Sequence, residues 1–141
     1  MNPIRVLVHG SLGKMGTEVI KAIDAAPDIE AVASVDIGYS GEFSHSGQNM
    51  IPLSDDLESA LISSKPDVVV DFTNAEGCMS CGEIALGKGV RVVSGSTGLT
   101  DENLAKLSHL ATEARSGILI APNFALGMVV LLSLVRKIAP H

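Results

Sequence analysis

Short apolar runs alternate along the chain with longer segments in which apolar residues recur every three or four positions. The runs are rich in β-branched residues and stop at glycine or polar residues, which is typical of strands buried on both faces. We therefore predict five strands, at residues 4–9, 29–36, 68–72, 90–94 and 118–121.

Amphipathic spacing predicts helices between these strands. Met15, Val19 and Ile23 fall on one stripe of a helix over 14–26, which Pro27 ends. Side chains that commonly cap helices precede the other segments. They predict a helix over 55–63 capped by Ser54, one capped by Thr73 or Asn74 that runs to about 87, and one from Thr100 to about 115.

Two segments depart from this alternation. Residues 37–49 are rich in glycine and serine, so we predict a mobile loop there. Residues 126–138 form a last predicted helix that is apolar on almost every side, and such a helix needs cover from more than one direction. We expect the chain to be a fragment of a longer one, or a domain completed by another subunit.

The order of elements predicts an α/β fold with a doubly wound, Rossmann-like parallel sheet, because strands that alternate with helices are joined by right-handed crossovers. We divide the chain into a dinucleotide-binding domain at 1–126 and a helix at 127–141. That helix is expected to lead toward a substrate or oligomerisation domain that this chain lacks.

Glycines mark the turn between the first predicted strand and the first helix. Gly10, Gly13 and Gly16 give the spacing G-x-x-G-x-x-G, one residue longer than the usual dinucleotide fingerprint. At such a corner, backbone N–H groups and the helix dipole can hold a pyrophosphate. The alternative is a strand-to-helix turn with a structural role alone.

An acidic residue supports the nucleotide interpretation. Asp36 ends the second predicted strand and follows Gly16 by 20 residues, the position at which an acid meets the hydroxyls of the adenosine ribose. A carboxylate there repels a 2′-phosphate, and the next residues supply no arginine or lysine, so NAD(H) is favoured over NADP(H). Lys14, in the phosphate loop, keeps NADP(H) open as the alternative.

Three more loops follow predicted strands, at the sheet edge where open α/β sheets bind ligands. Asp71-Phe72-Thr73 follows the third strand, Gly95-Ser96-Thr97-Gly98 the fourth, and Ala121-Pro122-Asn123-Phe124 the fifth. The hydroxyls of Ser96 and Thr97 and the amide of Asn123 can hydrogen-bond a carboxamide or a ribose. Each loop is also compatible with ordinary turn chemistry.

Taken together, four segments resemble the 4-hydroxy-tetrahydrodipicolinate reductase (dihydrodipicolinate reductase) family of bacterial lysine biosynthesis, over essentially the whole chain. The segments are Val8–Gly16, Asp71–Thr73, Gly95–Gly98 and Asn123–Ala125 with Gly127. The family's Gly-Thr-Thr-Gly appears here with Ser96, which retains a hydroxyl, and its Asn-Phe-Ser appears with Ala125. Two alternatives stay open, a nucleotide-binding domain of an aspartate or homoserine dehydrogenase and a non-catalytic NAD(H)-binding module.

The resemblance implies a site for NAD(H), with NADP(H) as the alternative cofactor. It assigns Gly10, Ser11, Leu12, Gly13, Lys14 and Met15 to the phosphates, Asp36 to the adenosine ribose, Gly95, Ser96, Thr97, Ala121, Pro122, Asn123 and Phe124 to the nicotinamide end, and Phe72 and Thr73 to the same cofactor-binding set. In the family, a second domain supplies a His-His pair, a lysine and a segment that grips the carboxylates of the small dicarboxylate substrate. We find none of these here and assign no catalytic residue to this chain.

Composition narrows the classes of partner. The 141 residues, 46% of them hydrophobic, can bury the core of one domain, and 16 acidic against 10 basic residues give a net charge of −6. Without a basic cluster, nucleic-acid binding is not expected. We find no signal peptide and no apolar stretch of the about 20 residues that span a membrane, so we expect a cytoplasmic protein without a membrane partner. A homo-oligomer is expected only together with the missing domain.

Residues that could indicate other chemistry have simpler explanations. Cys78 and Cys81 have C-x-x-C spacing but no second pair to complete a zinc site, so we expect them to lie in a helix, either packed or on its surface, and two cysteines suit a reducing compartment. His9 is expected to be a hydrogen-bonded core histidine. Asp55 and Asp56 are expected to be charges at a helix start rather than catalytic carboxylates, and no metal ligands are assigned.

Overall fold

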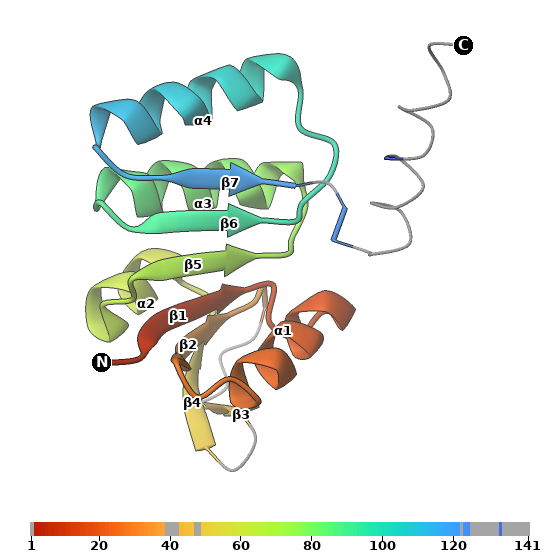
Figure 1. The fold of residues 1–141 in the computed structure, drawn as a ribbon, viewed down its shortest axis with the longest axis vertical. Helices are drawn as coiled ribbons and strands as arrows, with labels where there is room; N and C mark the ends of the chain where they lie inside the picture. The colour runs from red at the N-terminus through yellow and green to blue at the C-terminus, as the bar shows by residue number, and fades with distance from the viewer. Residues whose placement is uncertain (1, 39–42, 47–48, 122, 125–132, 134–141) are drawn as a thin grey trace.

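One seven-stranded sheet organises the computed structural model, which describes residues 2–38, 43–46, 49–121, 123–124 and 133. The strand order is β3-β4-β2-β1-β5-β6-β7, with β3 antiparallel to β4 and all other neighbours parallel (Figure 1). The strands are β1 (Ile4–His9), β2 (Ile29–Val35), β3 (Phe43–Ser46), β4 (Asn49–Ser54), β5 (Val68–Asp71), β6 (Arg91–Ser94) and β7 (Ile118–Ile120). The predicted doubly wound α/β fold is confirmed.

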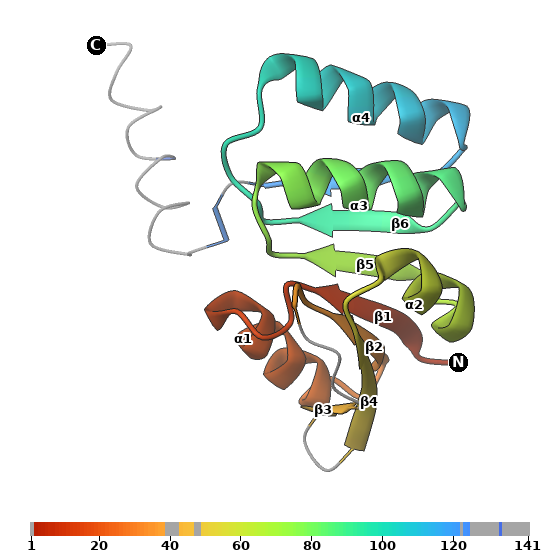
Figure 2. The same ribbon diagram turned by 180° about the vertical axis from the view of Figure 1, so that it is seen from behind.

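Helices cover both faces of this sheet within the described chain. They are α1 (Lys14–Asp24), α2 (Leu57–Ser64), α3 (Ala75–Gly87) and α4 (Asp101–Glu113). On one face α1 packs against Val6 and Val8, and on the other α2, α3 and α4 enclose Leu7 and Val69 (Figure 2). Successive residues of β1 thus enter two separate cores, which explains why Val6, Leu7 and Val8 are all apolar.

Side-chain caps fix where α2 and α3 begin, and one differs from the prediction. Asp56, not Ser54, caps α2, because its Oδ1 accepts hydrogen bonds from the N–H groups of Glu58 (2.9 Å) and Ser59 (3.2 Å). The Ser54 hydroxyl instead accepts from Asp56 N–H. Of the two candidates for α3, Asn74 is the cap and accepts from the N–H of Gly77 at 2.8 Å.

The prediction of a mobile loop over residues 37–49 is wrong where it overlaps the hairpin of β3 and β4. We did not predict β3 because that segment is rich in turn-forming residues. The strand is stabilised by its antiparallel pairing with β4. In β4, Ile51 and Leu53 are buried and Met50 and Pro52 are exposed, an alternation typical of a strand. A proline inside the run weakened that signal.

Part of the sheet lacks a described cover. Val68 and Val70 of β5 and Val93 of β6 line an apolar hollow of about 320 Å³ beside α1, and Leu119 of β7 is 57% exposed. The predicted helix 126–138 and the domain boundary at 126 lie outside the described residues, apart from Ser133. Among the helices that are described, none combines the length and the apolar character that crossing a membrane requires.

Both cysteines belong to the core between the sheet and α3. Cys78 and Cys81 are free thiols with no exposed surface. Burial raises the pKa of each thiol, and the nearby negative charge of Asp71 raises it further. The prediction that they lie in a helix is confirmed, and both are packed rather than on its surface.

Replacing Leu107 by alanine tests the core between α3 and α4. Leu107 is completely buried, so Leu107→Ala should lower the free energy of unfolding by about 2–5 kcal/mol, measured by urea denaturation. Leu104→Ala, on the same helix but 39% exposed, is the control and should cost about 1 kcal/mol or less. Equal losses in the two variants would contradict the packing described here.

The thiols provide a second test of the core. Because they are buried and their pKa is raised, neither should react with a thiol-specific disulfide reagent in the folded chain at pH 8. Both should react after denaturation in guanidinium chloride. Rapid labelling of the folded chain at Cys78 or Cys81, located by mass spectrometry, would be inconsistent with their place in the core.

Candidate functional site

Four strands end side by side at one edge of the sheet, and their ends bring the candidate residues together. The strand register aligns His9 with Val35 on one side and with Asp71 on the other, and Asp71 with Ser94. Each of these is the last residue of its strand. The loops that follow therefore meet at the carboxyl edge, toward which the arrowheads of Figure 1 point. Open parallel sheets bind ligands at this edge.

The corner between β1 and α1 is built for glycine. Gly10 has φ +78°, and a Cβ there would lie 2.7 Å from the carbonyl oxygen of Phe72. A Cβ on Gly16 would collide with the carbonyl oxygen of Gly10. The absence of a side chain at Gly16 therefore allows α1 to pack closely against the loop that precedes it. Side chains at either position would push the loop away from the sheet edge.

The first turn of α1 has no side-chain cap, unlike the other described helices. Its capping residue is Gly13, and no acidic residue lies in the turn. Asp56, Asn74 and Thr100 each accept backbone N–H groups at the starts of α2, α3 and α4. Within its first turn, α1 thus offers no anion of its own to the N–H groups and the positive dipole end that lie at the carboxyl edge. A phosphate group suits this position.

Asp36 joins the loop after β2 to the glycine loop. One carboxylate oxygen accepts from the N–H of Leu12 at 2.7 Å, and the other accepts from the N–H of Ile37 at 2.8 Å. Asp36 is half-buried, and the glycine loop and the acid predicted to share a ligand are therefore in direct contact.

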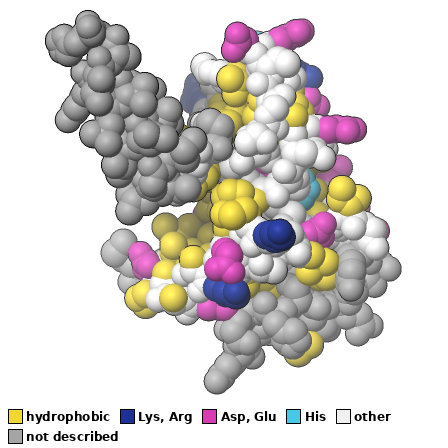
Figure 3. All heavy atoms as spheres, turned by 90° about the vertical axis from the view of Figure 1, so that its right-hand side faces the viewer, with side chains coloured by type: hydrophobic (Ala, Val, Ile, Leu, Met, Phe, Trp, Pro, Cys, Tyr) yellow, Lys and Arg dark blue, Asp and Glu magenta, His cyan; other side chains and the backbone are white. Residues whose placement is uncertain are grey.

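Two hollows open beside this contact, and both include Asp36, Ile37, Thr73 and Asn74. The smaller, of about 310 Å³, is also lined by Gly10, Leu12, Gly13 and Phe72. The larger, of about 500 Å³, has five carboxylates in its lining and no lysine or arginine; they belong to Asp36, Asp55, Asp56, Glu58 and Glu76. Figure 3 shows this edge, with exposed hydrophobic side chains next to acidic ones.

Aromatic rings form the side of the site away from Asp36. The rings of Phe72 and Phe124 lie 5.5 Å apart between centroids, tilted by 59°. A Cβ on Gly95 would collide with the Phe72 ring, so this glycine makes room for an aromatic side chain of the protein itself. Phe124 is 47% exposed and presents apolar surface beside the site.

A buried carboxylate lies beneath the loops. Asp71 has no exposed surface, and its side chain accepts hydrogen bonds from Thr73 and Ser94 (2.7 Å each), Ser96 (2.8 Å) and His9 Nδ1 (2.9 Å). Burial of the carboxyl group raises its pKa, but these hydrogen bonds outweigh burial and leave the pKa of Asp71 below its ordinary value. Because an ionised carboxylate only accepts, His9 Nδ1 carries a proton. His9 is hydrogen-bonded in the core, as predicted.

The predicted cofactor residues fall into three groups. Gly10, Leu12, Gly13, Asp36, Phe72 and Thr73 line the smaller hollow. The hydroxyls of Ser11 and Ser96 point inward, to the carbonyl oxygen of Val35 and to Asp71, and their N–H groups also donate within the protein, to Val35 and to the Ser94 hydroxyl. Lys14, Met15, Thr97, Gly95, Ala121, Asn123 and Phe124 lie around the edge, and Pro122 lies outside the described residues.

Sequence reasoning placed Asp71 in a loop at the ligand-binding edge and in a family motif but assigned it no role, and it considered Asn74 only as a helix cap. The signal for Asp71 was that three neighbouring apolar strands each end in a polar residue, His9, Asp71 and Ser94, and that these residues lie at the same level of the sheet. For Asn74 the signal was its capping role, since a cap at a carboxyl-edge loop also lines the hollow.

One described group has ligand atoms close enough for a metal ion. Atoms of His9, Asp71 and Cys81 lie within 4.8 Å of one another. Asp71 already accepts four hydrogen bonds, and burial raises the pKa of the Cys81 thiol, which opposes the thiolate that a metal needs. We assign the group to a hydrogen-bonded core.

Comparisons with known proteins agree with this geometry. The family described as "Dihydrodipicolinate reductase, N-terminus" matches residues 4–124. The 4-hydroxy-tetrahydrodipicolinate reductase of Dehalococcoides mccartyi strain BAV1 is 41% identical over 138 residues, which are 96% of this chain and 52% of that protein. The chain spans about half the length of the curated relatives it matches.

Solved structures show the same relationship. A dipicolinate-bound dihydrodipicolinate reductase from Paenisporosarcina sp. TG-14 has a TM-score of 0.83 and 32% identity, covering 97% of this chain and 54% of that one. The WlbA dehydrogenase of Chromobacterium violaceum, solved with NADH and UDP-GlcNAcA, has a TM-score of 0.75 over 86% of this chain and 35% of its own, but at 16% identity it shows the fold alone. The chain belongs to the dihydrodipicolinate reductase family and corresponds to its amino-terminal part.

Proposed function

We propose that this chain is the NADH-binding part of a 4-hydroxy-tetrahydrodipicolinate reductase. Reduced nicotinamide bound there would supply a hydride to the cyclic dicarboxylate precursor, which would also lose its 4-hydroxyl as water with uptake of one proton, giving tetrahydrodipicolinate and oxidised nicotinamide. The observation that carries the proposal is the contact between the Asp36 carboxylate and the Leu12 N–H, beside the uncapped start of α1. It joins a phosphate position to a ribose position, as dinucleotides require.

The phosphates would be held by the glycine loop. Residues 10–15 surround the start of α1, where N–H groups and the helix dipole favour an anion. Gly10 and Gly13 line the adjacent hollow without side chains that would block a close approach. Lys14 is exposed in the first turn of α1 and adds a positive charge near that position.

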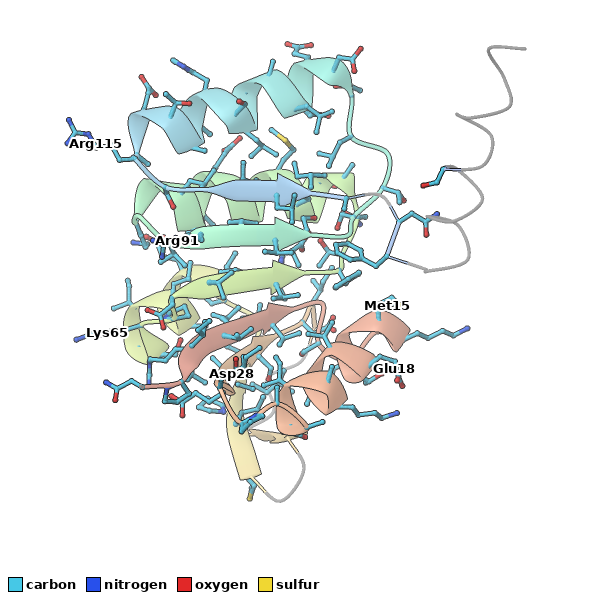
Figure 4. All side chains as sticks on the ribbon, viewed as in Figure 1. Met15, Glu18, Asp28, Lys65, Arg91 and Arg115 are labelled. Atoms are coloured by element: carbon cyan, nitrogen blue, oxygen red, sulfur yellow. The ribbon has the colours of Figure 1, made fainter. Side chains whose placement is uncertain are left out.

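The adenosine ribose would meet Asp36. A carboxylate accepts hydrogen bonds from two ribose hydroxyls but repels a 2′-phosphate. Four of the five carboxylates around the larger hollow strengthen that repulsion, and the fifth, Glu58, is paired with Lys88 at 2.9 Å. Lys65, Arg91 and Arg115 extend from the opposite edge of the sheet, too far away to offset it (Figure 4). These charges support NADH rather than NADPH.

The nicotinamide end would lie over β6 and β7. The family resemblance assigns this end to residues 95–97 and 121–124, and the Phe72 and Phe124 rings lie in contact there. Apolar rings exclude water from one side of a ring-shaped ligand, which keeps its reactive carbon oriented and dry. The groups that grip the dicarboxylate substrate would come from the part of the relatives that this chain does not span.

Measuring NADH binding and NADH oxidation separately tests the proposal. The 141-residue chain should bind NADH, measured by calorimetry, and show no oxidation of NADH when the dicarboxylate precursor is added. Turnover by the purified chain would contradict the division of labour proposed here. Failure to bind either NADH or NADPH would contradict the proposed site itself.

Changing Asp36 tests the ribose assignment. Asp36→Arg removes a repulsive charge and adds a phosphate partner, so the Kd ratio of NADPH to NADH should fall by roughly ten- to hundredfold. The ratio is informative even if loss of the Leu12 hydrogen bond weakens both ligands.

Asp28→Arg is the matched control for this substitution. Asp28 precedes the amino end of β2, the same strand that Asp36 follows, and is exposed at the other edge of the sheet. The charge change is identical, so the control should leave the ratio within about twofold of the parent chain, because distant exposed charges are screened by salt. An equal change in both variants would remove Asp36 from the ribose role.

A further inference from the structure

We propose that Asp71 is a positioning residue for the nicotinamide side of the site, acting through Ser96 on the loop of residues 95–98. The carboxylate touches no predicted ligand position itself, because it is completely buried. It joins neighbouring strand ends and the loops that follow them. This inference rests on the proposed function and adds to it a residue that the cofactor does not contact.

The two carboxylate oxygens serve different parts of the site. Oδ1 accepts from His9 Nδ1, at the end of β1 directly before Gly10, and from the Thr73 hydroxyl in the loop after β5. Oδ2 accepts from the hydroxyls of Ser94, at the end of β6, and Ser96, in the loop that follows. One oxygen therefore anchors the phosphate side, and the other anchors the nicotinamide side.

Only a carboxylate meets the demands of this position. Four donors converge on it, and an ionised carboxylate offers about four lone-pair sites, whereas a neutral amide would turn an NH₂ group toward two of those donors. A buried charge is stable only when its hydrogen bonds are complete. Burial of Asp71 is stable only while all four donors bond to it, and this need holds the four donors at fixed positions.

Ser96 is the donor through which the loop geometry is transmitted. It is 3% exposed, its hydroxyl binds Asp71 at 2.8 Å, and its N–H donates to the Ser94 hydroxyl at 3.1 Å. The Ser96 hydroxyl thus connects to Asp71 directly, and the Ser96 N–H connects to it through the Ser94 hydroxyl. The loop on either side, including Gly95 under the Phe72 ring, is oriented by these two bonds.

This arrangement predicts a selective loss of binding. Ser96→Ala removes one donor and should release the loop while the glycine loop and Asp36 stay in place. NADH affinity should fall roughly fivefold or more, and affinity for ADP-ribose, which lacks the nicotinamide, should change by less than about twofold. Ser96→Thr keeps a hydroxyl and should restore NADH affinity. Amide hydrogen exchange should rise in residues 95–98 and not in residues 10–16.

Asp71→Asn should lower NADH affinity by a larger factor and should also weaken ADP-ribose, because the carboxylate anchors both sides of the site. Its matched control is Asp67→Asn, because Asp67 is exposed just before the amino end of β5 and accepts from the N–H of Arg5 at 2.9 Å. That control should change the NADH Kd by less than about twofold. If Asp71→Asn does not fold, Ser96→Ala still tests the proposal.

The outcomes separate this inference from the proposed function. A parent chain that binds neither NADH nor ADP-ribose overturns the proposed function and the inference with it. A parent chain that binds both, with a Ser96→Ala variant that weakens both equally or neither, overturns the inference alone. Loss confined to NADH, with rescue by Ser96→Thr, supports it.

Discussion

A parallel sheet brings the carboxyl ends of its strands to one edge, and this constraint determines where the chemistry of this chain lies. His9, Val35, Asp71 and Ser94 end neighbouring strands at the same level. The loops after them are then adjacent whatever their sequences. The protein uses this adjacency twice, for an anion position at the start of α1 and for a buried carboxylate that holds the loops in register.

Much of this could be predicted from sequence because it depends on local patterns. Apolar runs and helical spacing gave the parallel core, and the glycine loop and Asp36 were expected to share a ligand before their contact was known. The hairpin of β3 and β4 was missed because antiparallel pairing is a tertiary interaction and the segment is rich in turn-forming residues. The directions of the Ser11 and Ser96 hydroxyls depended on buried partners in other strands, which local patterns do not reveal.

Fold alone does not establish activity here. The same fold occurs in a dehydrogenase at 16% identity that was solved in complex with NADH and UDP-GlcNAcA. What distinguishes this chain is the set of side chains at the carboxyl edge: a carboxylate on the phosphate loop, an acidic hollow beside it and a phenylalanine pair on the other side. Family membership explains why these features occur together.

The most direct measurement is a crystal structure of the chain with NADH bound. The account predicts the pyrophosphate against the N–H groups at the start of α1 and the adenosine ribose hydroxyls on the Asp36 carboxylate. A structure with NADH bound elsewhere, or with the Asp36 carboxylate turned away from the ribose, would contradict it.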